Sequence, residues 1–411
     1  MNGQVRSALG AQAETMTIRD SVSVPAAPDA SAARASWAGV VTLMLGVFAL
    51  VTSEFLPASL LSLMATDLGI SEGTAGQVVT ATAVVGAIAG PTIGILFPRL
   101  DRRTLMIGLT LLAAASNLLV AISPAFWLLL IARLLLGAAI AGFWSMALAV
   151  SAQLVPSEHL GRAMMIVNTG VSVAIVAAVP LGSYLGSLLG WRSVFLLVAG
   201  LAVLAAIVQA IWLRSVAASS TAGFRSLLGA LRSPVMIVGL GGILLLAGGH
   251  FAGFTYIQPA AVNIPGLTAG GLAILLATYG VGGFVGNIVA GIVADRRLRL
   301  ALIAMPALLG VAVASFALFS QVVPLAFVAV ALWGVGFGGV PTIVQTWVAR
   351  AEPDRLESAG GLVVSTFQIA IALGAVVGGL LVDGAGVTVA LVSGGVSAVV
   401  GGMLLSAARR R

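Results

Sequence analysis

Cysteine is absent from the 411 residues of this chain, and histidine occurs only twice. The lack of thiols excludes disulfide frameworks, thiolate metal sites and cysteine nucleophiles, and two histidines leave little material for a zinc centre. Charged residues are also scarce, at 8% of the chain, whereas they make up about 25% of ordinary soluble proteins. These shortages exclude a soluble protein and argue against a metalloenzyme, so we expect no metal and no cofactor.

Signatures of enzymes and ATP-driven pumps are missing as well. The apolar runs contain no paired carboxylates and no nucleophile with a base at a useful spacing, and the chain has no phosphate-binding Gly-Lys-Ser/Thr loop. We therefore expect that the protein is not an enzyme and that ATP hydrolysis within this chain does not drive its work.

Long apolar runs fill most of the chain, since 60% of its residues are hydrophobic. A helix needs about 20 apolar residues to cross a hydrocarbon layer that is roughly 30 Å thick. Twelve segments qualify, and the ten-residue alternation of a β-barrel does not appear. The predicted spans are 37–61, 74–97, 104–122, 125–154, 163–188, 193–213, 235–261, 269–293, 300–319, 323–349, 358–382 and 387–406.

Polar intervals divide these spans into two groups of six. Residues 1–36 are rich in Ala, Ser and Pro, lack an apolar stretch long enough for a signal peptide, and are predicted to be a disordered cytoplasmic tail. The next longest polar interval, 214–232, is a cytoplasmic linker between six-helix bundles at 37–213 and 233–406, and residues 407–411 are a basic tail. The expected fold is an all-α integral membrane protein with twelve transmembrane helices.

All 20 basic residues are arginines, and their positions predict the orientation in the membrane. Short cytoplasmic loops retain positive charge. If the N terminus lies inside, 18 of the 20 arginines fall on the inner side, Arg192 lies outside, and Arg133 lies within a span. A nucleic-acid surface would not follow loop parity, so the net charge of +7 does not indicate a nucleic-acid partner. We expect both termini to be cytoplasmic, in a bacterial inner membrane.

The second half of the sequence repeats the first. Gly94 and Arg99 recur as Gly291 and Arg296, each 197 residues later, and many other positions follow the same offset. Because each half has an even number of spans, both insert with the same orientation and form a parallel repeat. Substrate sites in such folds lie between the halves, near the middle of the membrane.

Three motifs carry a resemblance to a known family. The loop after the second span reads GILFPRLDRR at 94–103, and GIVADR at 291–296 matches it in the second half. Arg133 begins a motif in the fourth span, and the fifth span has VPLG at 179–182, preceded by Gly170. These stretches resemble the major facilitator superfamily, and specifically its twelve-helix drug/proton antiporter branch.

The resemblance implies the major facilitator fold and assigns a gating role to the loop motifs. The first copy departs from the family pattern, because Pro98 stands at the usual Asp position and Asp101 at the usual Gly position. The residues that the resemblance places in gating or motif positions are Gly94, Arg99, Asp101, Arg102, Arg103, Gly170, Pro180, Gly182, Gly291, Asp295 and Arg296.

Residues 54–61, 67–77, 142–146 and 254–259 are most similar to exporters of purine ribonucleosides within that branch. We therefore expect a proton-coupled secondary transporter that exports a small polar solute, with purine ribonucleosides as the leading candidate. A sugar or multidrug efflux transporter of the same superfamily is the alternative, and a non-transporting membrane sensor or scaffold is a more remote one. The expected partners are the solute, protons and the lipid bilayer, with no obligate protein partner.

Three ionisable residues lie inside predicted spans, where each costs about 2.5 to 3.5 kcal/mol on insertion scales and so indicates a function. They are Glu54, Arg133 and His250. In the resembled fold the first, fourth, seventh and tenth spans line the central cavity, which would bring the three together. We expect Glu54 to exchange protons and Arg133 to tune it, with His250 either taking part or serving as a neutral hydrogen-bonding group. A static ion pair between Glu54 and Arg133 is the alternative.

Helical spacing suggests substrate contacts. Trp144 shares a face of the fourth span with Arg133, and Phe337 lies on the corresponding face of the tenth. The two rings are predicted to sandwich a flat base. The alternative is that the aromatic side chains only fill the core and the amides only join helices. The donors and acceptors suited to ribose hydroxyls and base edges are Asn168, Tyr256, Gln258, Gln345 and Gln368.

Overall fold

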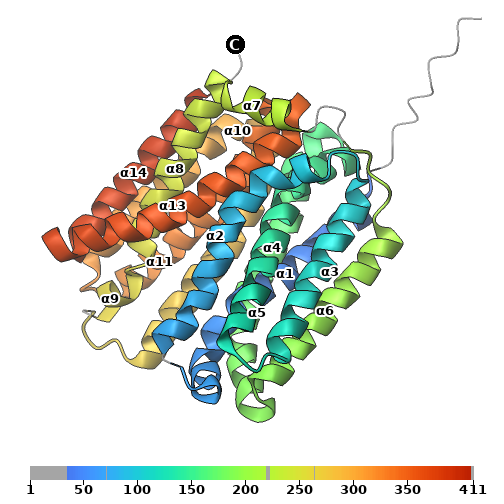
Figure 1. Ribbon diagram of the computed structural model, residues 1–411. Coiled ribbons are helices and arrows are strands. Elements are labelled where there is room, and N and C mark those ends of the chain that lie inside the picture. The colour runs from blue at the N-terminus through green and yellow to red at the C-terminus, as the bar shows by residue number, and fades with distance from the viewer. Residues whose placement is uncertain (1–34, 71, 219–222, 263, 409–411) are drawn as a thin grey trace, which may run out of the picture. The chain divides into compact units, whose positions relative to one another are not determined.

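The computed structural model describes residues 35–70, 72–218, 223–262 and 264–408. The part of the chain from Ser36 onward forms one compact unit. Nearly all of the predicted N-terminal tail, the linker residues 219–222 and the last three arginines lie outside the described residues. Helices and short connections account for the described backbone (Figure 1), in agreement with the all-α prediction.

The first half contains six long helices. They are α1 (Trp37–Leu68), α2 (Glu72–Leu96), α3 (Arg102–Ala121), α4 (Phe126–Leu154), α5 (Leu160–Leu189) and α6 (Trp191–Trp212), with the 3-10 turn η1 (Ser157–His159) before α5. Ser36 caps the start of α1 by accepting a hydrogen bond from the Gly39 amide at 3.3 Å. Gly69 ends the helix at φ 63°, a left-handed conformation that suits glycine.

The second half contains α7 (Phe224–Leu231), α8 (Pro234–Phe254), α9 (Ile257–Val262), α10 (Ala269–Phe319), α11 (Val323–Gly338), α12 (Val340–Ala351), the 3-10 turn η2 (Pro353–Arg355), α13 (Leu356–Ala385) and α14 (Val387–Ala407). The short helix α7 lies in the segment predicted as a polar linker. Along the chain it follows α6 and precedes α8, and in space it packs on α8 and α13 (Figure 1).

Twelve membrane crossings are consistent with these helices. Within the described residues, ten segments are long and apolar enough to span a bilayer. One of them, Gly270–Phe319, bends at Arg297, where φ is −139° and ψ is 55°, and therefore holds two crossings. The shorter apolar segment Val84–Leu96 in α2 supplies the remaining one.

Two predicted spans are interrupted, and proline explains both breaks. The predicted span 235–261 ends as a long helix at Phe254 and resumes as α9, which contains Pro259. The predicted span 323–349 is divided at Gly339, two residues before Pro341. Proline lacks an amide proton and its ring clashes with the carbonyl four residues earlier, so a helix bends or ends there.

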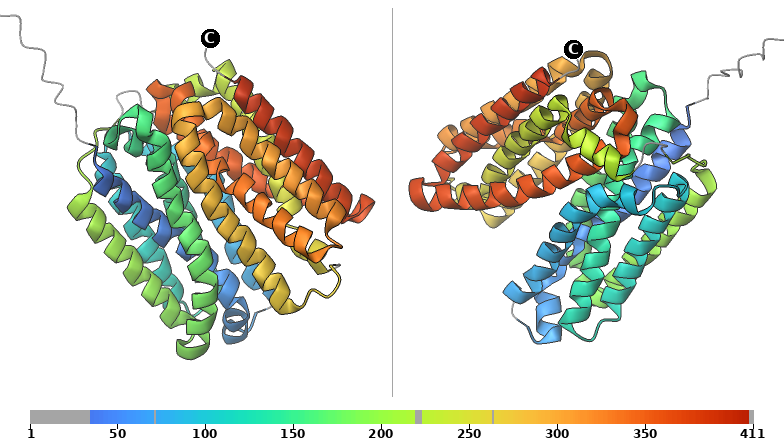
Figure 2. Two further views of the ribbon diagram at one scale, coloured as in Figure 1. Left: turned by 180° about the vertical axis from the view of Figure 1, so that it is seen from behind. Right: turned by 45° about the horizontal axis from the view of Figure 1, so that its top comes forward.

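The helices form two bundles, and six helices contribute to the contact between them. In the first bundle α1 packs on α5, α2 on α4, and α3 on α6, while in the second α8 packs on α13 and α14, and α10 on α11. Between the bundles, α2 and α4 contact α13, and α5 contacts α10 and α12. The bundles run closest together at the end that carries α7 and the last turn of α14, and they spread apart toward the end that carries α9 (Figures 1 and 2). We call the former the arginine end, because Arg102, Arg162 and Arg350 lie there.

Glycine allows the backbones of α10 and α11 to touch. A Cβ atom at Gly286 would lie 2.0 Å from the carbonyl oxygen of Val335, and one at Gly334 would lie 2.1 Å from that of Tyr279. Lipid offers no hydrophobic drive for helices to associate, so such close contact supplies much of the packing energy.

This contact predicts a large effect for a small substitution. Gly286→Ala should lower stability by about 1 to 3 kcal/mol, because the added methyl group forces the two backbones apart. Gly108→Ala on α3 is the matched control, since nothing lies within 4 Å of its Cβ position. Thermal unfolding of the purified variants in detergent measures the difference, and equal midpoints for the two variants would contradict the packing argument.

Candidate functional site

A buried polar cluster lies in the first bundle, where α1, α3 and α4 meet. Arg133 on α4 is 0% exposed. Its Nη1 donates to the Ser53 carbonyl oxygen at 3.0 Å, and its Nη2 donates to the Glu54 carbonyl oxygen at 3.2 Å. Asn117 on α3 donates to the Ser53 hydroxyl oxygen at 2.7 Å. The guanidinium group is therefore held by the backbone of α1.

Pro57 explains why a carbonyl group of α1 is available to Arg133. In an uninterrupted helix the amide of residue 57 would donate to the carbonyl oxygen of Ser53. Pro57 lies inside α1 and has no amide proton, so it leaves that oxygen without its helical partner. The guanidinium group of Arg133 takes its place.

The carboxylate of Glu54 is not used by this arrangement. None of the four ion pairs among the described residues contains Glu54 or Arg133, although their charges interact. The Nε atom of Arg133 has no hydrogen-bond partner among the described residues. A buried charge without a paired counter-charge is costly, so a carboxylate close to this guanidinium is electrostatically significant.

His250 lies in an aromatic cluster of the second bundle instead. It is 2% exposed on α8. Its ring stacks on Phe337 with the centroids 3.4 Å apart, its Nδ1 accepts a hydrogen bond from Trp333 Nε1 at 3.1 Å, and its Nε2 lies 3.4 Å from the Tyr279 hydroxyl. No ring contact, ion pair or hydrogen bond among the described residues joins His250 to Glu54 or Arg133. The structure thus brings Glu54 and Arg133 together and places His250 in a separate cluster.

The predicted substrate contacts fall into two groups. Asn168 and Tyr256 already have partners: the Asn168 amide donates to Thr342 Oγ1 at 3.0 Å, and the Tyr256 hydroxyl donates to the Ala375 carbonyl oxygen at 2.9 Å. The Asn168 side chain thus connects α5 to α12, and the Tyr256 side chain connects the turn before α9 to α13.

The second group has unused hydrogen-bonding or stacking capacity. The side-chain oxygen of Gln345 is buried without a partner, and Gln368 makes no hydrogen bond to any described residue. Trp144 is half-buried and makes no ring contact with a described aromatic residue. The side chain of Gln258 lies outside the described residues.

A series of hydrogen bonds between the bundles was not predicted from the sequence, and we call it the polar ladder. Thr342 on α12 donates to Asn287 Oδ1 at 2.6 Å and accepts from Asn168 on α5, while the Asn287 amide donates to the Met165 carbonyl oxygen at 2.9 Å. Asn287 lies inside a predicted span next to Gly286, and an amide in a membrane helix signals an interhelical bond. That signal was available in the sequence.

At the arginine end, an ion pair joins the two bundles. Arg102, at the start of α3, is 0% exposed and Glu357, at the start of α13, is 5% exposed. Two parallel hydrogen bonds connect them: Nε donates to Oε1 at 2.6 Å, and Nη2 donates to Oε2 at 2.5 Å. Gly94 lies beside this pair, because its Cβ position is 3.8 Å from Glu357 Oε2. We call this contact the first latch.

Asp101, which precedes Arg102, serves the first bundle alone. Its carboxylate caps α3 by accepting from the amides of Arg103 and Thr104, at 2.8 and 3.2 Å, and it accepts from the Ser215 hydroxyl. Partial burial raises the pKa of Asp101, but the hydrogen bonds from Ser215 and from the backbone outweigh it, so the net pKa is lowered. Among the described residues, no hydrogen bond or ion pair connects Asp101 to the second bundle.

A second latch lies across the same interface and combines a helix cap with an ion pair, in which Arg162 Nε lies 3.5 Å from Asp295 Oδ2. Asp295 on α10 caps α5 of the other bundle, where its Oδ1 accepts from the Gly161 amide at 2.6 Å and its Oδ2 from the Arg162 amide at 3.3 Å. A carboxylate at a helix N-terminus is favoured by the unpaired amides and by the helix dipole. Gly291 allows this approach, since a Cβ there would be 2.4 Å from Met165 Cβ.

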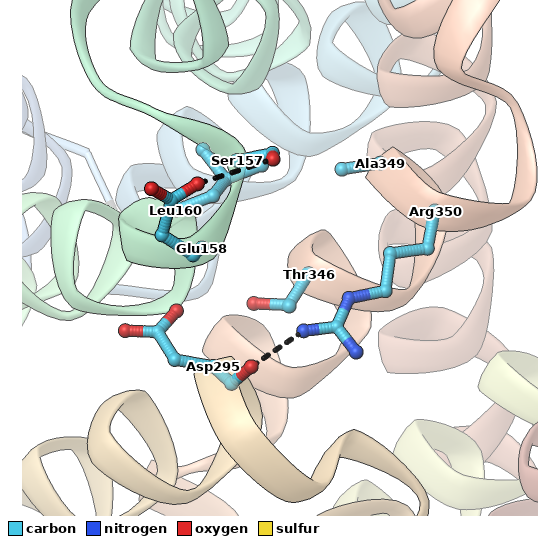
Figure 3. A pocket seen from close by; sticks show the side chains of 7 residues that line it. All are labelled: Ser157, Glu158, Leu160, Asp295, Thr346, Ala349 and Arg350. Carbon is cyan, nitrogen blue, oxygen red and sulfur yellow. Dashed lines mark hydrogen bonds between the residues drawn. The ribbon is translucent and has the colours of Figure 1, made fainter.

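A cavity of about 330 Å³ adjoins the second latch (Figure 3). Arg350 on its wall donates to the backbone carbonyl oxygens of Ala294 and Asp295, at 3.0 and 2.9 Å, which caps the end of the helical stretch before Arg297. The lining residues come from both bundles and are Ser157, Glu158, Leu160, Asp295, Thr346, Ala349 and Arg350.

The other motif residues have simpler positions. Arg99 and Arg296 are exposed and make no ion pair or hydrogen bond with the described residues, whereas Arg103 donates to the Ala210 carbonyl oxygen. Gly170 and Gly182 of α5 lie against α1, where Cβ atoms would be 2.4 Å from Met44 O and 2.5 Å from Ser59 Oγ. The side chain of Pro180 lies outside the described residues.

Comparisons with known proteins agree with this architecture. The family model described as Major Facilitator Superfamily matches residues 43–351 and 250–411. The purine ribonucleoside efflux pump NepI of Salmonella typhimurium strain LT2 is 37% identical over 354 residues, which cover 86% of this chain and 89% of that protein. NepI of Salmonella enteritidis matches over the same length at the same identity.

Solved structures show the same fold at low identity. The E. coli fucose:proton symporter FucP superimposes with a TM-score of 0.76 at 17% identity, covering 92% of this chain and 100% of that one. The proton:xylose symporter XylE gives 0.72 at 14% identity, covering 90% and 94%. The family match and the 37% identity to an efflux pump identify a multi-pass membrane transporter rather than an enzyme. The chain belongs to the major facilitator superfamily and is a secondary transporter.

The first latch generates a prediction that uses the cysteine-free background. Arg102→Gln removes both hydrogen bonds of this ion pair. Breaking a buried ion pair typically costs about 3 to 5 kcal/mol, so the substitution should open the arginine end. Maleimide labelling of Thr346→Cys, which is 2% exposed on the cavity wall, should then become several-fold faster.

Arg299→Gln is the matched control for this experiment. Arg299 follows Arg102 by 197 residues, so it occupies the same motif position in the second half, but it is exposed and makes no ion pair or hydrogen bond with the described residues. Its substitution should leave the labelling rate unchanged. Equal labelling rates in the Arg102→Gln and Arg299→Gln backgrounds would show that the ion pair does not hold the end closed.

Proposed function

We propose that this transporter exports purine ribonucleosides in exchange for protons, and that both termini face the cytoplasm of a bacterial inner membrane. The similarity to NepI supports the solute, and the distribution of arginines supports the orientation. In this orientation the arginine end is cytoplasmic, so the latched arrangement is the one with its cytoplasmic side closed.

One observation carries the proposal for proton coupling: Glu54 lies next to a fully buried arginine whose position does not depend on the carboxylate. Because Arg133 is anchored on backbone carbonyl groups, it stays in place whether Glu54 is charged or neutral. Glu54 can therefore release a proton while a fixed positive charge compensates for it. Inward movement of one proton supplies about 2.3 kcal/mol per 100 mV of membrane potential.

The unused side chains support a flat, uncharged and hydrogen-bonding solute. Trp144 and the face of Phe337 opposite His250 offer ring surface, and the amides of Gln345 and Gln368 offer donors and acceptors that no described residue uses. A ribonucleoside has a planar base for the rings and hydroxyl groups for the amides. Gln258 stays in this proposal on the sequence pattern alone.

A sugar exporter of the same superfamily is the second candidate. The free amides of Gln345 and Gln368 suit sugar hydroxyls as well as ribose. A sugar makes less use of the aromatic faces, which is why the nucleoside is preferred. The two solute classes are separated by direct transport measurements.

The test is pH-gradient-driven transport in sealed proteoliposomes. Wild-type protein should accumulate labelled inosine or adenosine when a proton gradient is imposed, in preference to a monosaccharide or a lipophilic cation. Glu54→Gln should abolish this accumulation while leaving exchange of labelled for unlabelled nucleoside at equal concentrations intact. The reason is that exchange requires the substrate site but no net proton movement.

Asp383→Asn is the matched control, because Asp383 is an exposed acid at the far end of α13. It should accumulate nucleoside as the wild type does. Undiminished accumulation by Glu54→Gln would remove Glu54 from the coupling mechanism. Preferential transport of the sugar or the cation would favour the alternative solutes, and no transport of any solute would favour a sensor or scaffold.

A further inference from the structure

The contacts of His250 define its protonation state without reference to pH. The indole Nε1 of Trp333 is only a donor, so the His250 Nδ1 that faces it at 3.1 Å must carry a lone pair. The ring proton is then on Nε2, which lies 3.4 Å from the Tyr279 hydroxyl. Both nitrogens of the neutral ring are thereby occupied. Charging the ring at Nδ1 would require the bond to Trp333 to break.

The same contacts fix the plane of Phe337. Its ring lies parallel to that of His250, with the centroids 3.4 Å apart and the planes at 10°, while Phe251 meets it edge-on at 5.6 Å. Phe337 is followed by Gly338 and Gly339, which provide no neighbouring side chains on the chain itself. The orientation of Phe337 is therefore set across the helix interface, principally by His250.

A buried acceptor lies on the next helix, α12. Phe337 and Gln345 are eight residues apart across the α11–α12 junction, where Gly339 keeps nearly helical angles of φ −79° and ψ −17°. Gln345 therefore lies about two helical turns beyond Phe337 along the chain, past the break at Gly339. The Gln345 side-chain oxygen is buried without a partner. An oriented ring and an unused buried acceptor suit a planar base that carries an N–H donor.

The fold itself does not require this aromatic cluster. Subtracting the repeat offset of 197 residues from His250, Tyr279, Trp333 and Phe337 leads to positions in the first bundle that carry no rings. Those positions are Ser53, Thr82, Leu136 and Ile140. The first bundle has its charged cluster at the corresponding place, so the rings are a feature of the second bundle alone.

We infer that His250 is a positioning residue that stays neutral and holds the Phe337 ring in the plane on which the purine base of the solute stacks, with Gln345 accepting from the base. This inference rests on the proposed function and deepens it, since it assigns base recognition to the second bundle. Of the two roles that the sequence allowed for His250, this inference selects the neutral hydrogen-bonding group over the proton carrier.

Three variants separate positioning from proton transfer. His250→Ala removes the stacking partner of Phe337 and should raise the KM for purine nucleoside about tenfold while the maximal rate changes little. His250→Phe keeps a ring against Phe337 but cannot carry a proton. Combined with Trp333→Phe, which removes the indole donor that would otherwise be orphaned, it should restore the KM to within about threefold of wild type.

The measurements are initial rates of pH-gradient-driven nucleoside uptake in proteoliposomes, over a range of nucleoside concentration and pH. The pH profile of the His250→Phe/Trp333→Phe variant should coincide with that of the wild type. Phe337→Leu should reproduce the KM increase of His250→Ala. An inactive but folded double variant, a pH profile that moves with it, or an unchanged KM in His250→Ala would each overturn the inference.

These outcomes differ from a failure of the proposed function. If wild-type protein does not transport purine nucleosides at all, both the proposed function and this inference are wrong. If the wild type transports them but the double variant loses proton coupling, only the assignment of His250 is wrong. Thermal unfolding of each variant confirms that the proteins compared are folded.

Discussion

The contact across the arginine end is the constraint on which the transport cycle depends. Arg102 and Glu357 are buried against each other, and a buried charge that loses its partner is expensive unless water replaces it. Separation of the bundles would admit that water, so both the latched and the separated states can satisfy the charges, whereas a half-open dry state cannot. The chemistry of the latch thus favours two discrete arrangements, which is what alternating access requires.

The two latches show how a duplicated fold diverges in chemistry. The Asp295 carboxylate caps a helix of the opposite bundle, but the repeat-equivalent position holds Pro98, which has no acceptor to offer. On that side the interface uses the Arg102–Glu357 pair, and the neighbouring Asp101 caps its own helix. A similar division holds within the bundles, where one has a buried arginine beside an acid and the other an aromatic cluster.

Sequence patterns predicted the features that follow from local physics. Apolar run length fixed the spans, and the repeat and the motifs led to the family. Contacts between residues that are distant in sequence could not be predicted in this way. No sequence pattern pairs Arg102 with Glu357. The residues around His250 in the sequence also do not show whether it belongs to an aromatic cluster or to a proton pathway. The interruptions near Tyr256 and Gly339 were indicated by the prolines that follow them, but a hydropathy window averages over such breaks.

Helix α5 lies between the helix that carries Glu54 and the second latch, which Asp295 forms at the arginine end. Gly170 and Gly182 let α5 lie against the backbone and side chains of α1, the helix that carries Glu54, and the N-terminus of α5 is capped by Asp295 from the other bundle. Asn168, on the same helix, bonds to Thr342 between these two levels. Because a helix is stiff along its axis, a displacement of α5 would move the cap and the polar ladder together. The glycines of the fifth span therefore bring α5 into close contact with the helix that carries Glu54, while the other end of α5 joins the interface between the bundles.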